Sequence, residues 1–188
     1  MSLADQAGAD NKPIFSGGFE PRAPSAAASP RSAALDASTG QPRANPNASG
    51  VQDGAAASLD VGVALARIND YRKRNGLKPL KLDAQLTEAA KSHSRDLAKW
   101  DRISHYGSDG SNPWDRVKRV GFKAKLAAEN VGTGQANFDE VLEGWRKSEG
   151  HNKNLLLPDA THMGIALVTA PETKFKTFWT LVLGTPSS

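Results

Sequence analysis

The chain has 188 residues, a formal net charge of +4 and no cysteine, which excludes disulfide bonds and thiol catalysis within it. No apolar run approaches the ~18 residues of a membrane-spanning helix. The first ten residues also lack the apolar stretch of a signal peptide, so the sequence predicts neither feature.

Residues 1–58 differ in composition from the rest of the chain. They contain 15 Ala, 8 Ser, 6 Pro and 6 Gly, and few large apolar side chains. Such a segment cannot bury enough apolar surface to offset the entropy lost when it becomes ordered. We therefore expect residues 1–58 to form a flexible, low-complexity leader or linker. Residues 59–188 hold all four tryptophans and are long enough for one folded domain.

Basic residues are scattered through the expected domain, and the densest groups are 71–74 and 116–119. Both groups fall in predicted helices. We interpret them as solvated helix faces, and no partnership with nucleic acid is expected. A weak attraction to an anionic wall or membrane surface is left open.

Two helices are predicted at the start of the domain. Asp60 can cap the first, which runs to Asn75, and Gly76 suits the left-handed residue that follows a helix end. After an extended run, the second helix opens at Asp83 and ends near Trp100.

A Gly/Ser/Asp-rich loop at 103–112 leads to a short helix that starts at Pro113 and stops at Gly121. Residues 126–135 are rich in polar residues and glycine, so we predict a connection there. A fourth helix is predicted from about 137 to 149, where apolar residues follow the i, i+3, i+4, i+7 pattern.

Two strands are predicted to close the chain, at 161–170 and 175–184. Apolar residues occupy both faces of the second strand, which indicates a sheet covered on both sides. Helices first and an antiparallel pair last predict the α+β class. The faces expected in the second strand are Phe175, Trp179, Leu181 and Leu183 on one side and Phe178 and Val182 on the other.

The four histidines occupy different positions. His105 lies in the loop after the second helix, and His151 follows Gly150 at the predicted end of the fourth. Because functional side chains gather on loops held by rigid elements, these two rank first as site residues. His93 falls on a buried helical stripe and is interpreted as a satisfied core or boundary residue. His162 is expected to be half-buried or exposed at the start of a strand.

Glu129 is the main acidic candidate. It lies in a stretch with few large apolar side chains to bury, where its carboxylate could face solvent or a cleft. Asn130 and Asn154 could join it in a hydrogen-bond network, because buried polar groups need such partners.

Ser148 and Glu149 precede His151 at the predicted end of the fourth helix. A carboxylate there is unfavourable against the helix dipole unless a partner such as His151 offsets it. The Ser148–His151 spacing predicts serine hydrolase chemistry only weakly, since the sequence has no G-x-S-x-G elbow and no evident triad acid.

Several segments together resemble the CAP superfamily, also called the SCP domain, of cysteine-rich secretory, antigen 5 and pathogenesis-related proteins. The chain looks most like the short, cysteine-free bacterial branch. The matching segments cover about residues 60–184 in the family's order. They are LARINDYRKRNGLKPLKLDAQLTEAAKSHSRDLA, ISHYG, AENVG, VLEGWRKSEGHNKNLLLPDATHMGIAL and FWTLVLG.

The resemblance implies a three-layer α-β-α sandwich with a central antiparallel sheet. It also implies a cleft that in many members holds two histidines and two glutamates. His105, Glu129 and His151 match three of these positions. Ser148 stands at the second glutamate position, and its neighbour Glu149 would point about 100° away around a helix. The family's set of four is therefore incomplete here.

Two imidazoles and a carboxylate suffice for zinc with water as the fourth ligand, so His105, His151 and Glu129 are candidate metal ligands. Nothing in the sequence requires a cofactor, and the spacing differs from the H-x-x-x-H of metalloproteases. A metal-free His–Glu pair, a protonation switch near pH 6.5 and a structural network stay open.

The resemblance also implies an extracytoplasmic location: secreted, periplasmic or at the cell surface. We favour a binding or interaction module for a lipid, a small molecule or a cell-envelope ligand, and lean away from an enzyme. The alternatives are a metal-dependent hydrolase that uses the same cleft and a structural cell-envelope adhesion domain. A shared fold says where the site is, and little about what happens there.

Overall fold

The computed structural model describes residues 57–187. The predicted leader, residues 1–58, lies almost entirely outside this range and stays a prediction. The described part is built from nine helices and strands. They are α1 (Val61–Arg74), β1 (Lys81–Leu82), α2 (Ala84–Trp100), α3 (Pro113–Arg119), β2 (Ala124–Thr133), α4 (Phe138–Lys147), α5 (Glu149–Leu155), β3 (His162–Ala170) and β4 (Lys176–Pro186).

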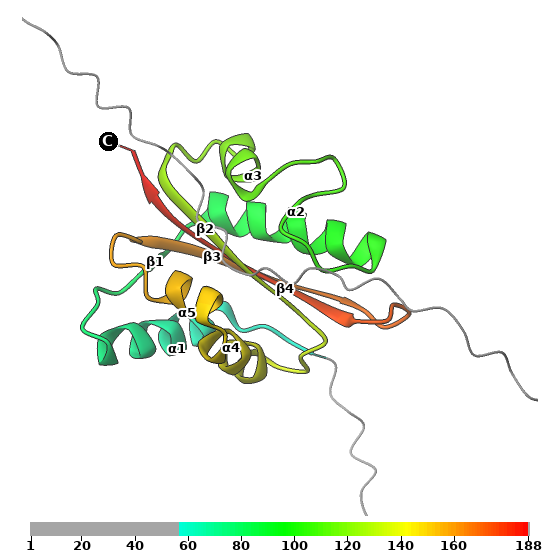
Figure 1. Ribbon diagram of the computed structural model, residues 1–188, viewed down its shortest axis with the longest axis horizontal. Coiled ribbons are helices and arrows are strands. Elements are labelled where there is room, and N and C mark those ends of the chain that lie inside the picture. The colour runs from blue at the N-terminus through cyan, green and yellow to red at the C-terminus, as the bar shows by residue number, and fades with distance from the viewer. Residues whose placement is uncertain (1–56, 188) are drawn as a thin grey trace, which may run out of the picture. The chain divides into compact units, whose positions relative to one another are not determined.

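The strands form one sheet in the order β1-β3-β4-β2. The three long strands are antiparallel, as predicted for the last two, and β1 adds a two-residue parallel pairing to β3. Helices α1, α4 and α5 cover one face of the sheet and α2 and α3 the other (Figure 1). This arrangement confirms the predicted α+β, three-layer architecture.

Local signals set the helix starts. The Asp60 and Asp83 carboxylates accept hydrogen bonds from backbone N–H groups in the first turns of α1 and α2. Asn112 and Asp115 form a reciprocal capping box at α3. Gly76, at φ +73°, takes the left-handed conformation after α1 that its sequence position predicts.

Two main apolar cores flank the sheet, and a third, small cluster forms where Leu97 of α2 meets Phe178 of β4. The larger lies under α1, α4 and α5, and the smaller lies between the sheet and α2 and α3. On β4, Trp179, Leu181 and Leu183 face the larger core and Val182 the smaller, as the alternation predicts. Phe175 departs from the prediction: it precedes β4 and its ring packs edge-on against Phe178.

The predicted connection at 126–135 is wrong, because the chain there forms β2. This strand pairs with β4 from Ala124 to Thr133. Its apolar residues are mostly small, and two buried polar side chains interrupt them, so the sequence lacks a strand's usual pattern. Contacts from other elements satisfy those polar groups and allow the burial.

The predicted end of the fourth helix is also wrong. Helix α4 stops at Lys147, and Ser148 is extended, with φ −89° and ψ 120°. A new helix, α5, starts at Glu149 and contains Gly150 and His151. Gly150 therefore does not release the chain from a helix, and Glu149 lies in a first turn, where a carboxylate is favourable.

Candidate functional site

Glu129 is the centre of the candidate site. It lies on β2, and its side chain is fully buried. Its Oε1 atom accepts a hydrogen bond from His105 Nδ1 at 2.9 Å, and its Oε2 atom accepts one from Arg116 Nη2 at 2.6 Å. Both oxygens of the carboxylate are thus engaged by charged or titratable partners.

Arg116 was not predicted as a site residue. It belongs to the basic group 116–119, which was interpreted as a solvated face, but its side chain is 4% exposed. Its guanidinium also donates to the backbone carbonyls of Ser111 and His105. The spacing of the residues in the sequence could have indicated that Arg116 is buried. Pro113, Arg116 and Val117 follow the i, i+3, i+4 pattern of one helix face and form the buried side of α3.

His93 was predicted to be a satisfied core residue and is only partly so. It is buried, as predicted, but it lies in the site, with Nε2 3.6 Å from Glu129 Oε1. Nε2 is 2.8 Å from the Ser104 carbonyl oxygen. Because a carbonyl can only accept, Nε2 carries the proton in the neutral ring. Nδ1 has no hydrogen-bond partner within residues 57–187.

The cluster holds Glu129 ionised. Burial alone would raise the pKa of its carboxyl group. The hydrogen bond from His105 and the charges of His93, Arg116 and His105 outweigh burial and lower that pKa below its ordinary value. Burial lowers the pKa of His93, and the charge of Arg116 adds to this, although Glu129 opposes it. A buried carboxylate is thereby surrounded by a permanent cation and imidazoles.

His151 approaches the same region from α5. Its side chain is half-buried, and burial together with the charge of His105 lowers the pKa of its imidazole. Nδ1 lies 2.9 Å from the Ser148 Oγ atom, at hydrogen-bond distance. Ser148 therefore contacts the histidine, although it cannot supply the carboxylate expected at its position.

Two asparagines fix α5 against β2. Asn154 Nδ2 donates to the Glu129 backbone carbonyl at 3.0 Å and to Asn130 Oδ1 at 2.9 Å. Asn130 Nδ2 in turn donates to the His151 carbonyl at 3.0 Å. Successive residues of a strand point to opposite faces, so Glu129 meets α2 and α3 while Asn130 meets α5. The Asn130 and Asn154 amides thus connect α5, which carries His151, to the strand that carries Glu129.

Glu149 is not part of this arrangement. Its side chain is 85% exposed and pairs with Lys153 at 2.7 Å, one turn along α5. That hydrogen bond, with the charge of Lys153, lowers the pKa of the Glu149 carboxyl group. It does not replace the missing second glutamate of the family's set.

A pocket of about 130 Å³ opens beside the cluster, where α2, α3 and the loop between them meet. His93 and Arg116 line it together with polar side chains such as Asp96 and Ser111. Among residues 57–187, no group of three or more His, Cys, Asp or Glu side chains is arranged to hold a metal ion. In the same range, no helix has the length and hydropathy to cross a membrane.

Comparison with known proteins connects these observations. A model of the cysteine-rich secretory protein family, CAP, matches residues 65–183. The protein YkwD of Bacillus subtilis is 38% identical over 100 residues, which are 53% of this chain and 39% of YkwD. The chain therefore corresponds to about two fifths of that relative's length.

Solved structures agree with the family match. An extracellular protein with an SCP domain from Bacillus anthracis has a TM-score of 0.59 and 28% identity over 65% of this chain and 39% of that one. An outer surface protein of Borrelia burgdorferi has a TM-score of 0.60 over 67% of this chain and 92% of its own. At 21% identity, the second likeness shows the fold alone.

Proposed function

This chain belongs to the cysteine-rich secretory protein (CAP) family, and on that basis we propose that it is an extracytoplasmic binding module. Its ligand is a polar component of the cell envelope, recognised in the cleft that the family resemblance predicts beside His105 and His151. The 28% identical Bacillus anthracis protein, which is extracellular, supports this location.

The proposal rests on the two hydrogen bonds that the Glu129 carboxylate accepts. Both of its carboxylate oxygens are engaged, and the pKa of the group is lowered, so it has no proton to donate at neutral pH. A general base must reach the proton that it abstracts, and Glu129 is fully buried and already occupied. The carboxylate therefore orients its neighbours, which favours binding over acid–base catalysis.

The residues around Glu129 favour a polar ligand over an apolar lipid chain. His105 contacts the Glu129 carboxylate, and the His151 imidazole, paired with the Ser148 hydroxyl, lies close enough for the charge of His105 to act on it. Such groups fix ligand oxygens by directed hydrogen bonds. A sugar or peptide of the cell wall offers many such oxygens.

The test is sedimentation of the full chain with insoluble peptidoglycan sacculi over a range of protein concentrations. We expect saturable retention that weakens about tenfold in His151→Asn, the loss of roughly one good hydrogen bond in a desolvated site. His162→Asn is the matched control, because His162 starts β3 and is not among the partners of Glu129. Its retention should equal that of the native chain.

Two outcomes would contradict the proposal. Equal retention of the native chain and both variants would place binding outside the cleft, and absence of retention would remove this ligand class. Retention of the chain on neutral lipid vesicles, sensitive to His151→Asn, would replace the envelope ligand with a lipid.

A second candidate is a zinc-dependent hydrolase, which one observation favours. Glu129 accepts from His105 Nδ1, and carboxylates commonly orient metal-binding histidines in this way. In this proposal His105 and His151 hold the ion, which would supply an activated water, and Glu129 positions His105 without touching the metal. Both Glu129 oxygens already accept hydrogen bonds, which suits the orientation of His105 better than direct binding of the metal by Glu129.

Calorimetric titration of zinc into the chelator-stripped chain separates the two candidates. Stoichiometric binding that is lost in both His105→Ala and His151→Ala, with peptide or ester cleavage abolished by chelator, would support the hydrolase. Absence of heat, with both variants less stable than the native chain, would leave the histidines as binding or structural residues.

A further inference from the structure

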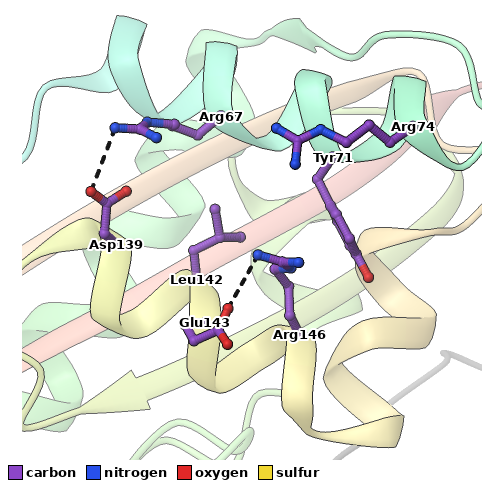
Figure 2. A pocket seen from close by; sticks show the side chains of 7 residues that line it. All are labelled: Arg67, Tyr71, Arg74, Asp139, Leu142, Glu143 and Arg146. Carbon is purple, nitrogen blue, oxygen red and sulfur yellow. Dashed lines mark hydrogen bonds and ion pairs between the residues drawn. The ribbon is translucent and has the colours of Figure 1, made fainter.

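A second pocket lies between α1 and α4, on the face of the sheet away from the Glu129 side chain (Figure 2). Its volume is about 350 Å³, within the range of small-ligand sites. Apart from the adjacent Leu142 and Glu143, the side chains from each helix are three, four or seven residues apart, so one stripe of each helix forms a wall. The lining residues are Arg67, Tyr71, Arg74, Asp139, Leu142, Glu143 and Arg146.

The charges in this pocket are not balanced. Arg67 pairs with Asp139 at 3.6 Å, and Arg146 pairs with Glu143 at 3.1 Å. Lys147 also approaches Glu143, at 3.3 Å, so one carboxylate serves two cations. The Arg74 guanidinium has neither an ion pair nor a hydrogen bond with any described residue. The lining therefore keeps an excess positive charge after its internal pairs are counted.

The floor of the pocket orients one of these cations. The Arg146 guanidinium lies 4.6 Å from the centroid of the Tyr71 ring, in a cation–π contact. The Tyr71 hydroxyl donates to Asn152 Oδ1 at 2.8 Å, which holds the ring in place. Leu142 adds a buried apolar surface beside it. Figure 2 shows the Arg74 and Arg146 side chains reaching into the same space between the helices.

We propose that this pocket binds the oxyanion of a phosphate ester, with Arg74 and Arg146 as its charged ligands. A phosphate group has enough oxygens to accept hydrogen bonds from guanidinium groups on two different helices, and such bonds are short and strong. Tyr71 and Leu142 contact the organic part of the ester. The ester belongs either to a soluble molecule or to a membrane headgroup, and the test distinguishes these sources.

This site is separate from the cleft of the proposed function. It uses α1 and α4 side chains, and none of its lining residues is among the partners of Glu129. His151→Asn, which weakens binding in the cleft, should leave phosphate binding unchanged. Failure of either proposal therefore leaves the other standing.

The first arm is calorimetric titration of the full chain with glycerol 3-phosphate at fixed ionic strength. Arg74→Gln and Arg146→Gln should each weaken binding at least tenfold, because each removes a charge-assisted hydrogen bond to the phosphate. Arg95→Gln is the matched control. It removes an exposed arginine of α2 that pairs with Glu88 at 3.4 Å and is not part of the pocket lining.

The second arm is co-sedimentation with vesicles of phosphatidylcholine containing phosphatidylglycerol at roughly a third of the lipid, so that the surface is anionic. Vesicle binding that is lost in Arg74→Gln and kept in Arg95→Gln identifies a headgroup, and binding of glycerol 3-phosphate alone identifies a soluble ester. Equal weakening in all three arginine variants would overturn the proposal, because it would indicate general surface charge. Absence of binding in both arms would overturn it as well.

Discussion

Each helical layer buries an arginine, and the two differ in what surrounds the charge. Arg72 of α1 is fully buried, and its guanidinium donates to four backbone carbonyls and to no carboxylate of the described residues. Arg116 of α3 is almost as buried, but it contacts the Glu129 carboxylate. The carbonyls that accept from Arg72 belong to Lys78, Leu155, Leu157 and Ala160.

The two arginines therefore differ in whether the groups that they contact can titrate. Backbone carbonyls do not titrate, so the group around Arg72 ties α1 to the chain after α5 in the same way at every moderate pH. Arg116 instead belongs to a set that includes Glu129 and His93, and the pKa values of both are shifted by their surroundings. Perturbed titratable groups of this kind concentrate at functional sites. Three predictions test the comparison.

The largest effect is expected from Arg116→Leu. It leaves the Glu129 carboxylate buried without its cation, and removing one partner of a buried ion pair costs about 3–5 kcal/mol. Urea denaturation of the full chain measures the loss. Adding Glu129→Gln should recover more than about 1 kcal/mol of it, because the uncompensated charge is then gone. If the two substitutions simply add, the ion pair does not behave as one unit.

Arg72→Met should cost less, about 3 kcal/mol, because it removes the buried charge together with its four hydrogen bonds. The unpaired carbonyls are neutral groups, and no carboxylate substitution can rescue this variant. Lys73→Met, one residue along α1 and exposed, is the control and should change the free energy of unfolding by less than about 0.5 kcal/mol. A cost for Arg72→Met no larger than that of its control would show that the carbonyl contacts contribute nothing.

Sequence patterns located the features of the fold that local chemistry decides. Asp60, Asp83 and Asn112 cap helices because each can reach a nearby N–H group, and this depends on a few adjacent residues. Alternation on β4 placed Trp179 and Val182 on opposite faces for the same reason. The α-β-α layering came from the family resemblance.

The missed features depend on contacts between distant segments. β2 carries Glu129 and Asn130 in its middle, and partners from α3, α5 and the loop that holds His105 offset the cost of burying them. The basic composition of 116–119 indicates solvent, and nothing local shows that Arg116 faces a carboxylate 13 residues further on. Helix α5 was missed because Gly150 is a usual helix stop, whereas the helix breaks earlier, at an extended Ser148.

The smallest effect concerns pH and distinguishes the two arginine environments without disrupting either. The folded-state pKa of His93 is lowered by burial, so the unfolded chain binds more protons at pH values between that pKa and the ordinary 6.5. Stability from this group is therefore complete above pH 6.5 and declines as the pH falls below it, by at most about 1.4 kcal/mol per pH unit. The lowered pKa of His151 acts in the same direction, and that of Glu129 extends the decline below its ordinary 4.5.

His93→Gln tests this, because a glutamine amide can still donate to the Ser104 carbonyl but does not titrate. Urea denaturation between about pH 7.5 and 5, across the range where histidine titrates, should show a flatter decline in this variant than in the native chain, with His151 responsible for the remaining slope. Arg72→Met should keep the native slope, because no titratable group faces that guanidinium in the contacts that hold it. A native slope in His93→Gln would assign the pH dependence to other groups, and a flattened slope in Arg72→Met would show that the two layers are coupled. If neither occurs, the part of the decline that His93→Gln removes belongs to the cluster around Glu129.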